Sequence, residues 1–173
     1  MATDASWADQ PVAYQLISGL AAQDALGPVM QVMQHGFDPL YGEAWNHSQT
    51  RSMLAMPLSH TILAETLPDT NSAQTRFPIA FAMTRRVADE EELLLIAVLP
   101  DWRRHRIGTA LLEQVIENAR NAGVSKIFLE MRSNNPASHL YQNFGFSQVG
   151  LRRNYYIGAD SRRHDALTLL KPL

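Results

Sequence analysis

The side chains best suited to chemistry in this sequence lie in one segment of its second half. Glu130 stands near the end of the apolar run "KIFLEMR", and Tyr141 follows within "NNPASHLYQNFGF". A carboxylate beside apolar neighbours suits a general base, because poor solvation favours its protonated form. A tyrosine phenol suits a general acid that protonates a leaving group. The pair predicts proton transfer; the alternatives are a carboxylate paired with an arginine and an aromatic that only packs.

A second candidate is the basic cluster Arg103, Arg104, His105 and Arg106, which precedes Gly108 and a helical pattern. The start of a helix leaves backbone N–H groups unpaired and carries the positive end of the helix dipole. Cations are unfavourable there unless an anion binds, so the cluster predicts a phosphate site. The alternative is a surface turn that binds nothing specific. Neither the dinucleotide motif G-x-G-x-x-G nor the phosphate-loop motif G-x-x-x-x-G-K-[ST] is present.

Hydrophobic periodicity and turn residues place these side chains in a chain of alternating strands and helices. Gly36 and Gly123 mark helix ends, and Asn46 or Ser48 caps the second helix. The predicted order is βααβββαβαββ, which gives an α/β (α+β) domain with a mixed, mostly antiparallel sheet of six to seven strands and about four helices. The predicted strands are 13–20, 60–67, 77–87, 92–99, 126–132, 147–157 and 164–173. The predicted helices are 21–37, 46–56, 107–123 and a short one within 134–146.

Two polar stretches are predicted to lie in solvent. The acidic run Asp89 to Glu92 reads as a solvated hairpin turn over 88–91, and residues 68–76 read as a polar loop. Residues 1–12 read as a flexible arm before a single domain over 13–173.

Composition narrows the class of protein further. The chain has 173 residues, 46% of them hydrophobic, and a formal net charge of −2, so we expect no nucleic-acid partner. It has no cysteine and no histidine pattern with metal-ligand spacing, so we expect no metal site. No signal peptide and no apolar run long enough for a membrane helix is apparent. We expect a cytoplasmic protein, a monomer or a weak dimer.

Three segments in order resemble the GNAT-type N-acetyltransferases. The acetyl-CoA signature of that family, [QR]-x-x-G-x-[GA], aligns with residues 103–108, and "LLIAVLPDW" is similar to the strand before it. "NNPASHLYQNFGF" resembles the element N-x-x-A-x-x-L-Y-x-x-x-G-F. The resemblance covers about residues 77–172 and implies a GNAT fold and transfer of an acetyl group from acetyl-CoA to an amine.

Within that family, "FLEMRSNN" and "GLRRNYYIGADSRRHDALTLLKPL" resemble segments of the ribosomal-protein-alanine N-acetyltransferases. This likeness implies Glu130 as general base, Tyr141 as general acid, and a protein N-terminus, such as that of a ribosomal protein, as acceptor. We expect the peptide to lie along Arg153, Tyr155 and Tyr156; an ordinary amphipathic strand is the alternative. The implied acetyl-CoA ligands are Ile96, Ala97, Val98, Arg103, Arg104, His105, Arg106, Ile107, Gly108, Thr109, Asn134 and Asn135.

The sequence departs from the family pattern at three points. The stretch between Arg132 and Tyr141 is one residue short, so either Asn134 or Asn135 matches the family asparagine. Arg106 occupies a glycine position of the signature, so either its backbone N–H alone serves the phosphates or its side chain also reaches them. His164-Asp165 replaces a Glu-Asp pair. Two other functions remain open from the sequence: acetylation of a small amine or antibiotic, and a CoA-binding module without turnover.

Overall fold

The computed structural model describes residues 11–67 and 76–173. The predicted element order is confirmed, while the loop predicted over 68–76 and most of the arm predicted over 1–12 lie outside the described residues. The first strand begins at Val12, a residue that the sequence assigned to the arm. The strands are β1 (Val12–Ser18), β2 (Ser59–Thr66), β3 (Phe77–Val87), β4 (Glu90–Val98), β5 (Lys126–Arg132), β6 (Ser147–Ile157) and β7 (Arg163–Pro172). The helices are α1 (Leu26–Gly36), α2 (His47–Leu54), α3 (Ile107–Asn121) and α4 (Ser138–Asn143), with short 3₁₀ turns η2 (Gly19–Gln23), η3 (Pro39–Tyr41) and η4 (Pro100–Trp102).

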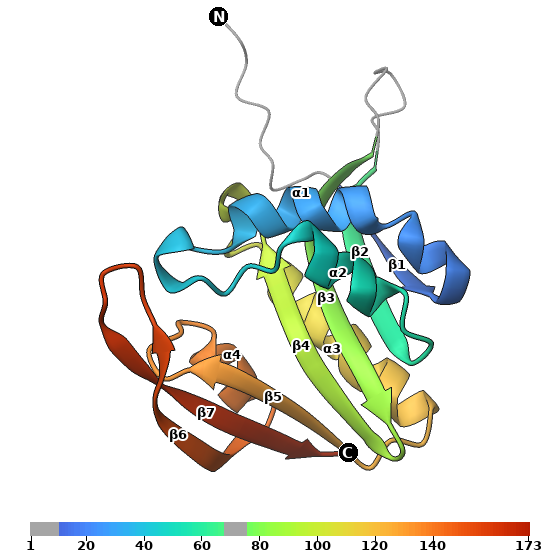
Figure 1. The fold of residues 1–173 in the computed structure, drawn as a ribbon. Coiled ribbons are helices and arrows are strands. Elements are labelled where there is room, and N and C mark those ends of the chain that lie inside the picture. The colour runs from blue at the N-terminus through green and yellow to red at the C-terminus, as the bar shows by residue number, and fades with distance from the viewer. Residues whose placement is uncertain (1–10, 68–75) are drawn as a thin grey trace, which may run out of the picture.

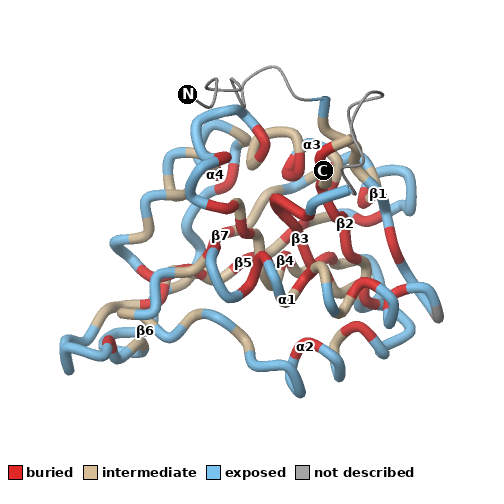
Figure 2. Tube along the Cα trace, turned by 90° about the horizontal axis from the view of Figure 1, so that it is seen from above, coloured by how far each residue is buried: buried red, intermediate tan, exposed pale blue. Residues whose placement is uncertain are grey.

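The strands form one seven-stranded sheet in the order β1-β2-β3-β4-β5-β7-β6. Neighbouring strands are antiparallel except β4 and β5, which are parallel. Helices α1 and α2 cover one face of the sheet, and α3 and α4 cover the other (Figure 1 and Figure 2). The central strand β3 is buried from Pro78 to Thr84, whereas the edge strand β6 is mostly exposed. The predicted fold class is therefore confirmed.

Strands β4 and β5 pair along only part of their length. Their register runs from Glu90↔Lys126 to Leu93↔Leu129, and in Figure 1 the strands spread apart beyond that point. The end of β4 keeps its bonds to β3: the Leu99 N–H donates to the Ile79 carbonyl at 2.9 Å. Because successive N–H groups of a strand point to opposite sides, the Val98 N–H points toward the β5 side, where β4 has no strand partner.

Helices α1 and α2 have the predicted residues at their ends, but Gly36 is a glycine for a different reason from the one predicted. Asn46 caps α2 in a reciprocal capping box with Gln49. Helix α1 ends at Gly36 as predicted, but this glycine is needed for close packing: an added Cβ would lie 3.1 Å from the Ala97 Cβ on β4. The predicted helix over 21–37 is split, because η2 precedes α1.

The prediction of a solvated turn over 88–91 is wrong for Glu91. The turn contains only Ala88 and Asp89, and Glu91 lies on β4 with 2% exposure. The Thr84 hydroxyl donates to Glu91 Oε1 at 2.5 Å, and Arg86 Nε donates to Oε2 at 2.7 Å. Strand alternation explains the burial, because Glu91 points to the same side as the buried Leu93.

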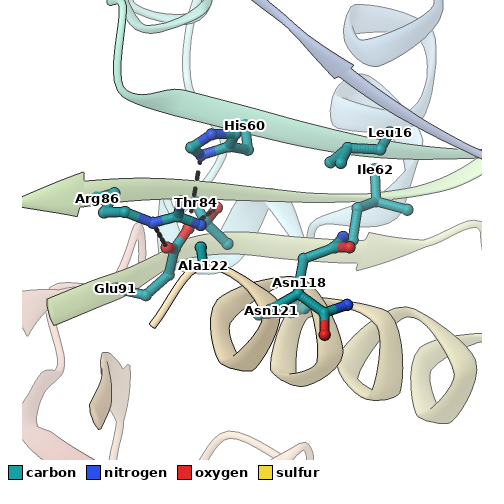
Figure 3. A pocket seen from close by; sticks show the side chains of 10 residues that line it. Leu16, His60, Ile62, Thr84, Arg86, Glu91, Asn118, Asn121 and Ala122 are labelled. Carbon is teal, nitrogen blue, oxygen red and sulfur yellow. Dashed lines mark hydrogen bonds and ion pairs between the residues drawn. The ribbon is translucent and has the colours of Figure 1, made fainter. Parts of the chain in front are cut away.

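The Glu91 carboxylate lies beside a cavity of about 260 Å³ between the sheet and α3 (Figure 3). His60 Nδ1 lies 3.7 Å from Glu91 Oε1, longer than a hydrogen bond, and Asn118 and Asn121 line the cavity from α3. Burial raises the pKa of Glu91, but interactions with His60, Thr84 and Arg86 outweigh it, so the pKa lies below its usual value.

We predict that Glu91→Gln lowers the free energy of unfolding by about 2–3 kcal/mol, because it leaves the half-buried Arg86 guanidinium without its counter-ion and the Thr84 hydroxyl without a charged acceptor. Urea denaturation measures the change. Glu92→Gln is the matched control: Glu92 pairs with Arg85 at the surface, where both side chains are at least 40% exposed. An exposed pair contributes less than about 1 kcal/mol. Equal losses in the two variants would contradict the prediction.

We also predict that the stabilising effect of Glu91 depends on pH. Its folded pKa is lowered, so unfolding takes up a proton in acid; the contribution is complete above the unfolded value of about 4.5 and is lost as pH falls through the folded pKa. The difference in Tm between the wild type and Glu91→Gln should therefore be largest near neutral pH and shrink below about pH 4.5. Thermal unfolding of both proteins between about pH 3 and pH 7 checks this; a constant difference would refute it.

Candidate active site

Glu130 lies on β5 on the face opposite Leu129 and Met131, as strand alternation predicted. Both neighbours are buried, while the Glu130 side chain is 25% exposed. Its Oε2 lies 3.5 Å from Nε of Arg152 on β6, and the Arg152 side chain is 59% exposed. The structure thus shows the arginine-paired carboxylate that the sequence left open, but the pair is long and solvent-exposed and leaves Oε1 available for a substrate.

Tyr141 lies on α4 and is 5% exposed. Its ring packs edge to face on Phe146, with ring centroids 5.8 Å apart, so the packing role expected as the alternative is real. Its hydroxyl has no hydrogen-bond partner among the described residues. Burial, together with the negative charge of Glu43, raises the pKa of Tyr141. The phenol therefore stays protonated at neutral pH, as a proton donor must.

Arg132, Glu43 and Tyr41 form a cluster next to Glu130 on β5, and the sequence did not point to any of the three. The side chain of Arg132 is 4% exposed, and its Nε lies 3.3 Å from Oε1 of Glu43, which follows η3. The Arg132 guanidinium also lies 3.3 Å from the centre of the Tyr41 ring and donates to Asn134 Oδ1. The feature of the sequence that could have revealed this cluster is Arg132 itself, a charged residue at the end of the apolar run that contains Glu130.

Strand β6 brings Tyr156 toward the same place through a bulge. The β6–β7 register shifts between Arg152 and Tyr156, Asn154 takes a left-handed φ of 54°, and its N–H donates to Asp165 Oδ1 at 2.8 Å. Burial, then the charges of Glu130 and Glu43, raises the pKa of Tyr156 to about 12.

The other two residues predicted to bind the peptide lie farther out. Tyr155 is 51% exposed and touches the Tyr156 ring edge-on, and Arg153 is exposed. The negative charge of Glu130 adds to the raised pKa of Tyr156, which burial mainly causes.

The basic cluster forms the turn that opens α3. Arg104 and Arg106 both have left-handed backbones, with φ of 69° and 61°. Arg106 is the N-cap, and α3 has neither a side-chain cap nor an acidic residue in its first turn. The first N–H groups of α3 therefore face outward unpaired in this part of the structure. The left-handed φ also explains the glycine position of the signature, since glycine adopts this conformation without strain.

Two members of the cluster are held by the protein itself. Arg103 donates from Nη2 to the Gly36 carbonyl at 2.8 Å and from Nε to the Val98 carbonyl at 3.2 Å. The His105 ring packs edge-on against Trp102, with centroids 6.5 Å apart. Arg104 and Arg106 form no ion pair within the described residues, so neither cation is neutralised by a carboxylate of that part of the chain.

The predicted cofactor residues converge on the open end of β4. A Cβ added to Gly108 would lie 3.7 Å from Leu140 of α4 and 3.8 Å from Val98 of β4, so the start of α3 lies beside both elements. The two asparagines separate in role. Asn135 Oδ1 accepts the Ala137 N–H at 2.9 Å in the turn before α4, and Asn134 contacts Arg132. The N-cap of α4 is Ala137, without a side-chain cap, so the alternative that an asparagine caps this helix is wrong.

Comparison with known proteins identifies the family. Residues 30–146, more than half of the chain, match the acetyltransferase (GNAT) family. This chain belongs to the GNAT family. It is 43% identical over 95 residues to a [ribosomal protein bS18]-alanine N-acetyltransferase of Escherichia coli strain K12, a match that covers 54% of this chain and 64% of that protein. It is 36% identical over 91 residues to the corresponding Haemophilus influenzae enzyme, covering 53% and 62%. The matched region thus spans less than two thirds of these curated relatives.

Solved GNAT structures share the fold over nearly the whole chain. The crystal structure of the ribosomal-protein-S18-alanine N-acetyltransferase from Escherichia coli matches with a TM-score of 0.76 and 28% identity, covering 92% of this chain and 94% of that one. Arabidopsis thaliana NAA60 in complex with acetyl-CoA matches with a TM-score of 0.73 and 16% identity, covering 94% and 99%, and shows the fold alone. Within residues 11–67 and 76–173, no helix could span a membrane and no group of three or more His, Asp or Glu side chains could hold a metal ion.

We predict that Arg106→Gly stabilises the fold and leaves CoA affinity within about threefold of the wild type. A left-handed non-glycine residue costs about 1–2 kcal/mol, and glycine loses about 0.5–1 kcal/mol more backbone entropy, so the net gain is about 0.5–1 kcal/mol. Arg106→Ala is the control, since it removes the side chain but keeps the strain. Denaturation and calorimetry with CoA measure both variants; a tenfold or greater loss of CoA affinity would show that the side chain is a ligand.

Proposed function

We propose that this chain is an acetyl-CoA-dependent N-acetyltransferase that modifies the α-amine of a protein N-terminus, with a ribosomal protein as the first acceptor to test. The observation that carries the proposal is the arrangement around the open end of β4. Gly108 at the uncapped start of α3 lies beside Val98 and beside Leu140, the neighbour of Tyr141, and Glu130 follows directly after the last β5 residue that pairs with β4. The bS18-alanine N-acetyltransferases that this chain resembles support the choice of acceptor.

The backbone N–H groups and cationic side chains around the open end of β4 suit acetyl-CoA as the cofactor. Acetyl-CoA supplies an activated acetyl thioester and a tail that carries several phosphates. The N–H groups of Gly108 and Thr109 and the side chain of Arg104 suit a pyrophosphate, because an uncapped helix start and a cation without an ion-pair partner both bind anions. The strand segment 96–98, unpaired on the β5 side, suits a backbone-to-backbone contact with the pantetheine amides. The complete set of proposed cofactor residues is Ile96, Ala97, Val98, Arg103, Arg104, His105, Arg106, Ile107, Gly108, Thr109, Asn134 and Asn135.

The proton steps fall to two side chains. Glu130 takes a proton from the acceptor amine, directly or through a water. An α-amine has a pKa near 8 and a lysine amine near 10.4, so an α-amine asks less of this base. Tyr141 donates its proton toward the departing sulfur. Its raised pKa opposes release, but a thiolate that forms in the same buried site is also a stronger base than in water.

Two further groups of the chain assist without exchanging protons. The Val98 N–H points into the site and can stabilise negative charge that develops on the acetyl oxygen. Tyr156, with a pKa of about 12, stays neutral and can donate a hydrogen bond to the peptide, beside Tyr155 and Arg153.

The test is acetylation by the purified protein. We expect acetyl-CoA and a peptide that begins with the N-terminal alanine of bS18 to give a product heavier by one acetyl group at its N-terminus, detected by mass spectrometry. Lysine-containing peptides with blocked N-termini, polyamines and aminoglycosides are parallel arms. Preference for a small amine would overturn the acceptor, and no CoA release with any amine would overturn the activity.

We predict that Glu130→Gln and Tyr141→Phe each lower kcat by about 10²–10⁴-fold, the usual contribution of a positioned acid or base. Affinity for acetyl-CoA should stay within about threefold, because neither side chain is a proposed phosphate or pantetheine ligand. Steady-state kinetics and calorimetry provide the two readouts. Glu117→Gln, on the exposed face of α3, is the control. Near-wild-type turnover in both active-site variants would remove these assignments.

A further inference from the structure

Glu43 lies close to the reacting groups although it is distant from them in sequence. It follows Gly42, which has a left-handed φ of 62°, and its side chain is only 17% exposed. Arg132 holds it at 3.3 Å, and the Leu40 carbonyl just before it accepts the Ala159 N–H at 2.7 Å. The position of Glu43 is thus fixed from β5 and from the loop between β6 and β7. A buried pair of this kind contributes little net stability, so stability alone does not account for it.

Glu43 and Glu130 meet on one face of the sheet. Arg132 and Glu130 are two residues apart on β5, so their side chains point to the same side, with Cα atoms about 6–7 Å apart. Arg132 engages Oε1 of Glu43, and Arg152 engages Oε2 of Glu130. Each carboxylate therefore has one oxygen without a partner among the described residues.

Neutral hydroxyl groups complete the surroundings. Tyr141 is 5% exposed, and its hydroxyl lacks a hydrogen-bond partner within the described chain. Burial raises the pKa of Tyr141 and of Tyr156, and the negative charge of Glu43 adds to both shifts. Two free carboxylate oxygens beside uncharged hydroxyls suit a cation with several N–H donors, and an ammonium group has three.

We propose that Glu43, positioned by Arg132, binds the acceptor amine in its protonated form and so selects substrates with a free N-terminal ammonium group. This inference rests on the proposed function and adds a specificity-determining residue to the same site. The ammonium places one N–H on Glu43 and another on Glu130. Glu130 then takes one proton, which leaves a neutral amine with a free electron pair and a protonated Glu130 carboxyl. Glu43 keeps its contact with the nitrogen through a remaining N–H.

The experiment compares binding of two peptides that differ only at the first residue. One begins with alanine, and the other begins with lactic acid, which replaces the ammonium by a hydroxyl. Calorimetry in the presence of CoA measures both affinities for the wild type, for Glu43→Gln and for Asp38→Ala. Asp38 accepts the Leu40 N–H at 2.9 Å and caps η3. Asp38→Ala therefore removes a contact from the same segment but keeps the Glu43 carboxylate.

We expect the wild type to prefer the amine peptide, and Glu43→Gln to weaken that peptide by about 10–100-fold while binding the hydroxy peptide like the wild type. Asp38→Ala should keep the preference. In turnover, Glu43→Gln should raise KM for the amine peptide by a similar factor and change kcat by less than about threefold. An unchanged preference in Glu43→Gln, or an equal loss in Asp38→Ala, would overturn the proposal. Absence of turnover in the wild type would overturn the proposed function instead. The binding comparison would still test whether Glu43 binds the ammonium group.

Discussion

The parting of β4 from β5 is the constraint on which the rest of the site depends. Pairing stops at Leu93↔Leu129, so the last residues of β4 pair with another strand on the β3 side alone. An unpaired strand edge inside a protein needs partners, because buried backbone groups without them are costly. The start of α3, α4 with Tyr141, and the end of β5 with Glu130 all lie around this edge (Figure 1).

The two halves of β4 serve different purposes. The paired half carries Glu91, whose contacts with β2 and β3 join three strands near the cavity of Figure 3. The half that does not pair with β5 carries Val98, whose backbone N–H has no strand partner. One end of the strand is thus fixed by a buried charge network, and the other is free to meet a ligand. Rigid support for a precise site is what proton transfer requires.

Local patterns in the sequence predicted the elements, and contacts between distant segments limited the rest. Periodicity gave the order of strands and helices, and the motif around Glu130 and Tyr141 gave the candidate acid and base. The pairing of Glu43 with Arg132 joins residues from distant parts of the chain, so no local pattern could show it. Glu91 was misread because a charge run resembles a turn, although strand alternation points its side chain inward. The bulge at Asn154 depends on a hydrogen bond to Asp165 across the hairpin.

Arg103 gives the molecule a mechanical link between its two ligand-facing regions. One side chain bonds the last carbonyl of β4 and the last carbonyl of α1, and α1 leads through η3 to Glu43. The end of β4 and the end of α1, the helix that precedes the Glu43 segment, are therefore joined through one guanidinium group. Any coupling through this link must be reciprocal: if a ligand at the end of β4 changes the affinity at Glu43, a ligand at Glu43 changes the affinity at β4 by the same factor.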